Sequence, residues 1–217
     1  MPSDDVSTPA QPPEAALDDP SVRKITDVQT LKALAHPVRI ALIEELELGG
    51  AMTATQVGER IGESATTCSF HLRQLAKYGF VEEAGGGTGR SRPWRLTSIG
   101  MSFRPSGDTE AELASDAVVR MFRQRQFDRY EAWRSSKASY PLEWRQAAVD
   151  GQYLFHLTAP ELAQFGNEVH ELLMRWGRLD GRLEDPSKRP AGSVPVEGLI
   201  LAHPIGLPKP EGGDGDA

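Results

Sequence analysis

The sequence has almost no cysteine and no long apolar run. Its one cysteine, Cys68, cannot form a disulfide within the chain, which favours a reducing compartment. No stretch approaches the roughly 20 apolar residues that a membrane-spanning helix needs. The first residues also lack the basic start and apolar segment of a signal peptide. We therefore expect a cytoplasmic protein with one large domain or two small ones.

A net positive charge is also lacking, because the formal net charge is -7. Taken alone, this value argues against a nucleic-acid partner. The acids are concentrated near both ends, however, and the balance reverses between Arg60 and Arg95, where six Lys or Arg residues face three Glu residues. A protein that is acidic overall can still present a local basic face. Composition therefore leaves DNA open as a partner.

Helical periodicity begins after residues 1–22, a tail rich in Pro, Ala, Asp and Ser that we expect to be disordered. Asp27 can cap a first helix that reaches about Ala35. Pro37 lacks an N–H group, so it must break or begin a helix. The apolar pattern that follows predicts a second helix from Pro37 to about Leu48.

Two further helices follow at the spacing of a helix-turn-helix. Thr53 and Gln56 form a capping-box pattern at the start of the first, and Gly62 closes it. Ser64 caps the second, which we expect to reach Tyr78. The short interval containing a glycine is typical of a helix-turn-helix.

After this helix, the spacing of apolar residues changes from that of a helix to that of a β-hairpin. The segments "FVEEA" and "PWRLTS" flank the glycine-rich "GGGTGRSR", which places the wing of a winged helix at residues 85–92. Four helices followed by a hairpin predict a winged helix-turn-helix domain over residues 23–104. The expected fold class is mainly α with a β wing, an α+β protein.

The helix from Ser64 to Tyr78 has two different faces at about 100° per residue. Cys68, Leu72 and Leu75 form an apolar seam toward the domain. The opposite face combines hydroxyls, two cations and one aromatic ring, a set that suits the DNA major groove; its residues are Thr66, Ser69, Phe70, Arg73 and Lys77. The alternative is that Phe70 packs on a dimer partner or on the wing.

Two stretches resemble the ArsR-type (arsenic-repressor-like, ArsR/SmtB-like) winged-helix regulators over about residues 28–103. "LKALAHPVRIALIEEL" is similar to the family's "ALAHPxRxxIL" start, and "SATTCSFHLRQLAKYGFV" is similar to its "SxxTxSxHLxxLxxxGLV" pattern. The resemblance implies a homodimeric DNA-binding transcriptional regulator, usually a repressor released by a signal. It also implies that His71 is mostly structural, with a phosphate of DNA as a contact that it could reach.

The outer face of the helix from Ser64 to Tyr78, the wing and the family resemblance together predict a set of DNA-binding residues. Arg90 and Arg92 lie at a glycine-rich tip that could enter the minor groove or grip phosphates, unless this tip is only a solvated loop. The predicted set is Ser64, Thr66, Thr67, Ser69, Phe70, His71, Arg73, Lys77, Arg90 and Arg92.

The sequence departs from metal-sensing relatives of that family. The helix "ATQVGERIG" has no cysteine pair, and the helix after the wing has acids but no histidine. Soft or borderline metals prefer Cys and His ligands. Cys68 is more simply a small core residue. We therefore expect no metal and no cofactor.

A long helix is predicted at Asp108–Trp133, inside a segment, 108–140, that we assign to dimerisation and a linker. Either Asp108 or Thr109 can cap it. Its apolar residues could pack on their own domain, but a winged helix is already nearly complete, which favours a dimer contact. The predicted dimer residues are Leu113, Ala117, Phe122 and Tyr130.

The pattern over residues 150–205 predicts a small C-terminal α/β unit, followed by a disordered tail at 206–217. Tyr153–Leu157 resembles a strand, Thr158 caps an amphipathic helix, and "VPVEGLILAHPIG" resembles a buried strand. This unit could form a plain core, a dimer surface or an apolar pocket for an effector.

Two other classes of function remain open. A winged helix can serve as a protein-interaction module that does not bind DNA. An enzyme would need an acid/base site, for which His156, His170 and His203 are candidates, but no spacing of acidic partners supports one. The expected protein is therefore a regulator and not an enzyme, with double-stranded DNA and a second copy of itself as partners.

Overall fold

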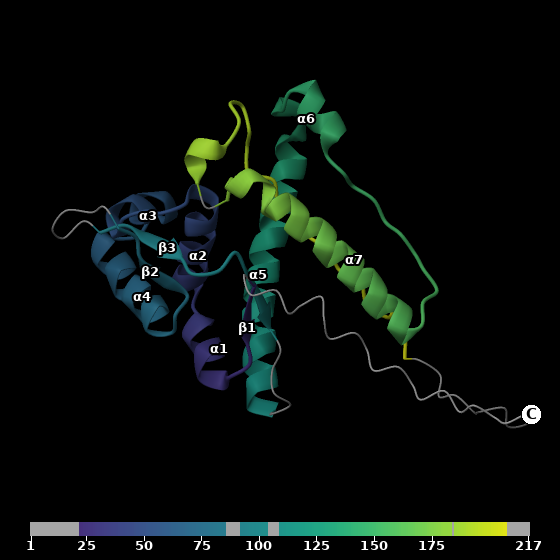
Figure 1. Ribbon diagram of the computed structural model, residues 1–217, viewed down its shortest axis with the longest axis horizontal. Coiled ribbons are helices and arrows are strands. Elements are labelled where there is room, and N and C mark those ends of the chain that lie inside the picture. Colours follow the sequence, from purple (N-terminus) through teal and green to yellow (C-terminus); the bar gives the residue numbers. More distant parts are fainter. Residues whose placement is uncertain (1–21, 86–91, 104–108, 184, 208–217) are drawn as a thin grey trace, which may run out of the picture.

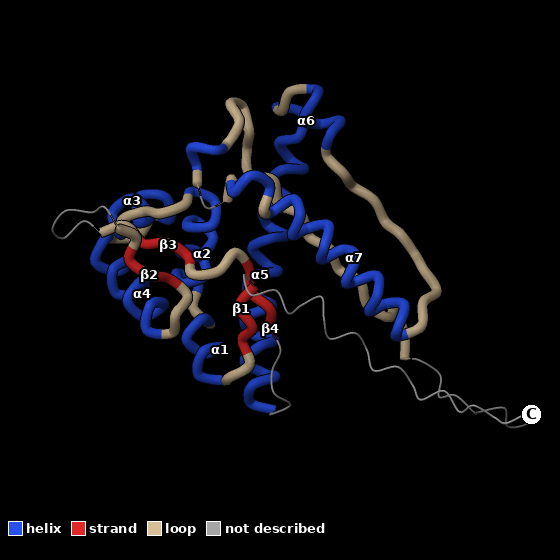
Figure 2. The backbone as a smooth tube through the Cα atoms, in the orientation of Figure 1, coloured by secondary structure: helices blue, strands red, loops and turns tan. Residues whose placement is uncertain are grey.

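The computed structural model describes residues 22–85, 92–103, 109–183 and 185–207. Most of these residues are helical, and two small sheets lie in the N-terminal half (Figures 1 and 2). The helices are α1 (Val28–Leu34), α2 (Pro37–Gly49), α3 (Ala54–Ile61), α4 (Ala65–Lys77), α5 (Thr109–Ser136), α6 (Leu142–Ala147) and α7 (Ala159–Gly177). The strands are β1 (Val22–Ile25), β2 (Val81–Glu83), β3 (Trp94–Leu96) and β4 (Gly100–Phe103), and the 3-10 turns are η2 (Lys137–Ser139), η3 (Leu179–Gly181) and η4 (Pro186–Lys188).

Side chains at the helix ends explain the boundaries of α1 to α4. The Asp27 carboxylate accepts a hydrogen bond from the first turn of α1, and Pro37 begins α2. Gly50 ends α2 with φ 77°, a left-handed value that glycine adopts at little cost. Thr53 and Gln56 form a reciprocal capping box on α3. The predicted division of this region into four helices is confirmed.

The strands of the predicted hairpin follow α4. β2 and β3 pair antiparallel, with Val81 opposite Leu96. Met52 also exchanges backbone hydrogen bonds with Trp94, which ties β3 to the turn before α3. The tip of the hairpin, with Arg90, lies outside the described residues.

A second pair of strands was not predicted. β1 and β4 pair in parallel, with Val22 opposite Gly100, and together they lie beside α1 and α5 (Figure 2). β1 therefore begins at the last residue of the segment expected to be disordered, while residues 1–21 lie outside the described part of the chain. A four-residue strand is too short to produce a recognisable alternation of apolar and polar residues.

The core lies among α1 to α4, both sheets and the first half of α5. Its fully buried side chains are Ile25, Leu31, Leu34, Ile40, Leu42, Val57, Cys68, Leu72, Leu75, Val81 and Val118. On α5, Ala111, Ser115 and Val118 face this core and α1. One face of α5 thus completes the N-terminal domain.

The predicted long helix is present as α5, but Leu113 and Phe122, both predicted as dimer residues, do not share one exposed face of it. Phe122 packs against Phe103 of its own domain, with ring centroids 6.0 Å apart. Leu113 lies on another face and is 63% exposed. The two residues are nine positions apart, which places them on opposite sides of a helix at about 100° per residue. Asp108 lies outside the described residues.

The C-terminal segment contains the predicted helix but not the predicted strands. Thr158 forms a capping box with Glu161 and begins α7. Residues 153–157 and 194–206 are loops without strand pairing (Figure 2), so the α/β description of 150–205 is corrected to one α-helix, two 3-10 turns and loops. A strand needs a backbone partner, and within the described residues neither segment pairs with another. Pro195 and Pro204 also lack the N–H group that a ladder needs.

Candidate nucleic-acid interface

Helix α4 is divided into a buried face and an exposed face, as its sequence predicts. Cys68, Leu72 and Leu75 are 0% exposed, and they pack into the domain core. Phe70, on the other side of the helix, is 55% exposed. Burial raises the pKa of the Cys68 thiol, so the thiol stays protonated at neutral pH and acts as a core residue.

The hydroxyl groups at the start of α4 have different surroundings. The Ser64 hydroxyl accepts a hydrogen bond from the Thr67 N–H at 3.0 Å, and the two hydroxyl oxygens lie 2.8 Å apart. Both side chains therefore take part in the helix cap. Thr66 is exposed, and Ser69 is partly exposed. Of the four hydroxyl residues, Thr66 is the one most available to a ligand.

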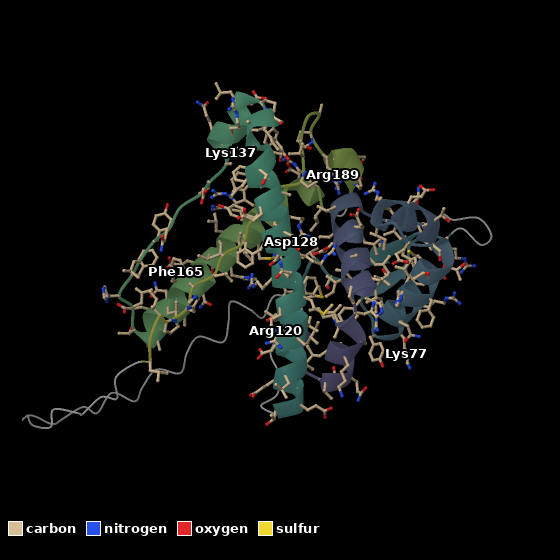
Figure 3. All side chains as sticks on the ribbon, turned by 180° about the vertical axis from the view of Figure 1, so that it is seen from behind. Lys77, Arg120, Asp128, Lys137, Phe165 and Arg189 are labelled. Atoms are coloured by element: carbon tan, nitrogen blue, oxygen red, sulfur yellow. The ribbon has the colours of Figure 1, made fainter. Side chains whose placement is uncertain are left out.

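Arg73 and Lys77 extend the exposed face toward the end of α4. Arg73 Nε donates to the Ser69 carbonyl at 3.0 Å, which fixes the stem of the side chain along the helix. This bond uses one of the five N–H donors of the guanidinium group. The Lys77 ammonium lies over the Tyr78 ring at 5.6 Å, at the outer edge of the domain (Figure 3).

His71 is buried and joins α4 to the start of α2. Its ring lies 4.4 Å from the ring of His36, and it meets Phe70 edge-on at 5.1 Å. His36 Nδ1 accepts from the Val38 N–H at 3.2 Å, which caps α2. These contacts support a structural role for His71, in which it orients the ring of Phe70.

We expect the free energy of unfolding to fall as pH is lowered from about 7.5 to about 5. Burial is the main cause that lowers the pKa of both His36 and His71. For His36, the charge of Arg39 lowers the pKa further. In the unfolded chain the two histidines titrate near about 6.5. Below that pH the unfolded state binds more protons than the folded state. The free energy of unfolding that is present at higher pH is therefore lost as the pH falls. Urea unfolding, followed by circular dichroism at several pH values, measures this loss.

The matched variants are His71→Gln and, on the exposed C-terminal segment, His156→Gln. His71→Gln should reduce the difference in stability between pH 7.5 and pH 5, whereas His156→Gln should leave it unchanged. Equal pH dependence in wild type and His71→Gln would exclude His71 as its source.

The cations at the base of the hairpin are paired with acids of β2. Arg92 binds Glu83 at 2.7 Å, and Arg95 binds Glu82 at 2.6 Å. The hydrogen bond that Arg92 donates to Glu83 raises the pKa of Arg92. These exposed pairs reduce the local positive field, which a count of charges along the sequence does not show. Exposed ion pairs are weak, so DNA phosphates could replace the carboxylates.

The end of α4 is held by a residue that was not predicted to matter. Arg23 of β1 donates to the Tyr78 carbonyl, and its guanidinium lies 4.3 Å from the centre of the Phe80 ring. Gly79 makes the turn with φ 71°, and the Thr97 hydroxyl donates to its carbonyl at 2.7 Å. These contacts fix α4 relative to the hairpin. The signal in the sequence was the short apolar and basic segment "VRKI".

The described residues hold neither a cluster of metal ligands nor a helix suited to a membrane. Within these residues, no three His, Cys, Asp or Glu side chains gather as metal ligands would. None of the helices in the same part of the chain combines the length and the apolar character needed to cross a bilayer.

Residues 34–84 match a family model described as a helix-turn-helix domain. The match begins at the end of α1 and includes α2, α3, α4 and β2, the elements that build the face described above. It does not extend to α5 or α7. A comparison with curated proteins finds no match. Fold and match together define a helix-turn-helix domain, which suggests a DNA-binding regulator of transcription.

Proposed function

We propose that the protein is a sequence-specific DNA-binding transcriptional regulator, a homodimeric repressor of the ArsR type that binds an inverted repeat. The observation that carries this proposal is the contrast between the two faces of α4. Its inner face is fully buried, while an aromatic ring, a hydroxyl and two cations lie on the outer face. A solvated helix gains nothing from an exposed phenylalanine, whereas a helix in a major groove does.

In this proposal α4 enters the major groove and the hairpin contacts the backbone. Arg73 can donate two hydrogen bonds to guanine O6 and N7, and Phe70 can contact a thymine methyl group. Thr66 lies beside the N-terminus of the helix, where free N–H groups favour a phosphate. The role of the chain is then recognition of DNA and not catalysis.

The homodimer is proposed to use the outer face of α5. Leu113 and Phe127 are 63% and 47% exposed, and Ala117 lies between them on the same face. Phe122 is not part of this surface. Tyr130 lies near Asp150, to which its hydroxyl donates at 3.1 Å. Two copies related by two-fold symmetry would place half-sites one helical turn apart, roughly 10–11 base pairs.

Selection of duplexes from a random pool tests this function. The full chain is expected to enrich an imperfect inverted repeat, and a gel shift with excess unrelated DNA should retain the complex. Lack of enrichment would instead favour a protein-interaction module. The effector pocket in the C-terminal segment stays a prediction. A pocket of about 20 Å³ beside Ile43 and Phe80, in the N-terminal domain, holds no more than a water.

Neutralising Arg90 and Arg92 together should weaken binding to all DNA sequences by a similar factor. Phosphate contacts release counterions and change the slope of log affinity against log salt by about 0.9 per phosphate on duplex DNA. We therefore expect a slope shallower by up to about 2 in the double alanine variant. Titrations from low to high salt measure it, with Lys188→Ala as a control for a distant cation. An unchanged slope in the double variant would contradict the wing assignment.

A further inference from the structure

Two histidine rings meet behind the exposed face of α4. His71 belongs to α4 and is 8% exposed, while His36 is the residue that caps α2 and is partly exposed. Their ring centroids are 4.4 Å apart. His71 also meets the ring of Phe70 edge-on, at 5.1 Å between centroids. The pair therefore connects the start of α2 to the aromatic ring that we propose as a DNA contact.

The hydrogen bond of His36 requires a neutral ring. Its Nδ1 accepts from the Val38 N–H at 3.2 Å, so Nδ1 carries a lone pair and the single ring proton lies on Nε2. In the imidazolium form both ring nitrogens carry protons, and Nδ1–H would then face another N–H donor. Protonation of His36 therefore removes the side-chain cap of α2 and displaces the ring.

The surroundings of His71 do not suit a second ring proton. Among the described residues, its Nδ1 is buried and makes no hydrogen bond. A neutral ring can keep its proton on Nε2, whereas an imidazolium would bury a charged N–H donor without a partner. Burying such a group has a high cost in free energy. The protonated ring of His71 is therefore more stable outside its present position.

The charges around the two rings mostly oppose protonation. Burial is the main cause that lowers the pKa of His71, the charges of His36 and Arg39 lower it further, and Glu63 raises it. Four charged or titratable groups from α2, from the turn before α4 and from α4 act on the rings or on their charged neighbours; they are Arg39, Glu63, Cys68 and Tyr78. Arg39 also donates to a backbone carbonyl at the end of α1. Glu63 is the carboxylate of this set toward which a charged ring would turn.

We infer that the His36–His71 pair holds the ring of Phe70 in its DNA-binding position only while both histidines are neutral, so that acid weakens sequence-specific binding. This role rests on the proposed DNA-binding function. When a ring gains a proton and moves, the edge contact between His71 and Phe70 is lost, and with it the placement of Phe70 against a thymine methyl group. His71 is thus a positioning residue of the outer face of α4.

Acid should weaken binding of the selected duplex, because that duplex binds the form of the protein in which both rings are neutral. A free histidine titrates near about 6.5, and burial lowers the pKa of both rings below this value. The loss is therefore absent at about pH 7.5 and grows as the pH falls below about 6.5. If one ring decides binding, affinity falls by up to about tenfold per pH unit below the pKa of that ring.

Fluorescence anisotropy of the full chain at about pH 7.5 and about pH 5.5, at constant ionic strength, tests this inference. We expect the ratio of affinities for the selected and the scrambled duplex to be at least about threefold smaller at the lower pH. Circular dichroism checks that each sample is folded. The variant His36→Asn/His71→Gln should have the same ratio at both pH values, because asparagine can still cap α2 and neither new side chain titrates. His156→Gln, in the C-terminal segment, should behave like wild type.

A fluorine label reports the position of the ring at residue 70 without DNA. Para-fluorophenylalanine placed at Phe70 in the full chain should give a fluorine chemical shift that changes as the pH falls below about 6.5. The shift should stay constant in the His36→Asn/His71→Gln background. If that variant does not fold, the titration of the label in the otherwise wild-type chain still tests the movement.

An equal pH effect in wild type and in the double variant would overturn the inference, as would a fluorine shift that does not change with pH. Tighter binding of the selected duplex at the lower pH would also overturn it, because the charged histidine would then contact a phosphate. Absence of a preferred duplex at the higher pH would contradict the proposed function, and the fluorine titration would still decide whether the pair moves Phe70.

Discussion

Leu72→Ala should lower the free energy of unfolding by about 2–5 kcal/mol, because it leaves a cavity in the packed core. Leu72 is 0% exposed and lies among the other fully buried side chains. Phe70→Ala, two residues earlier in α4, should change stability by less than about 1 kcal/mol, because it loses mainly an edge contact with His71. Urea unfolding of both variants measures the difference.

The same two variants separate stability from DNA binding. Phe70→Ala should remain folded and bind the selected duplex more weakly, whereas Leu72→Ala should lose binding only under conditions where it unfolds. A loss of several kcal/mol in Phe70→Ala would show that its ring belongs to the core. Unchanged affinity in a folded Phe70→Ala would remove this ring from the DNA surface.

Arg73→Ala should weaken specific DNA binding by roughly tenfold to more than a hundredfold. A bidentate contact to guanine contributes about 1–3 kcal/mol of discrimination, and each 1.4 kcal/mol is about a factor of ten. Among the described residues, Arg73 forms a hydrogen bond with its own helix, from Nε to the Ser69 carbonyl, so stability should hardly change. Fluorescence anisotropy with the selected duplex and with a scrambled duplex measures the effect.

Specificity distinguishes this effect from a general loss of charge. Arg73→Ala should lower affinity for the selected duplex much more than for the scrambled one. Lys188→Ala, which removes the same charge far from α4, should affect neither. An equal loss on both duplexes would show that Arg73 contacts only phosphates.

The sequence predicts the N-terminal domain well because its signals are local. A cap such as Ser64 needs only the next three residues, and the seam through Cys68, Leu72 and Leu75 repeats within one helix. Each of these patterns involves only residues close together in the sequence, and it predicts one local structure. For this reason helix boundaries and the exposed position of Phe70 could be predicted before the fold.

Features that depend on distant partners could not be predicted in the same way. β1 exists only because β4, more than 70 residues later, supplies its backbone partner. Phe122 faces inward because Phe103 lies beneath it. The mostly apolar residues at 153–157 resemble a strand, yet no partner strand lies beside them within the described residues. A pattern along the chain cannot show whether such a partner exists.

The pairing of charges at the site was missed for the same reason. Arg92 and Arg95 count as two positive charges in the sequence. In the structure, each lies beside a glutamate on the neighbouring strand. The register of the hairpin, which pairs Glu82 with Arg95, decides this and is not visible in a charge count.

The central claim is that the outer face of α4 contacts bases, and photo-cross-linking tests it most directly. A benzoyl-phenylalanine placed at Phe70 in the full chain should form a covalent adduct with the selected duplex. The unlabelled duplex should suppress the adduct, and a scrambled duplex should not. The same group at Asp128 on α5 should give no adduct. An adduct from position 128, or none from position 70 while the protein binds the duplex, would contradict the account.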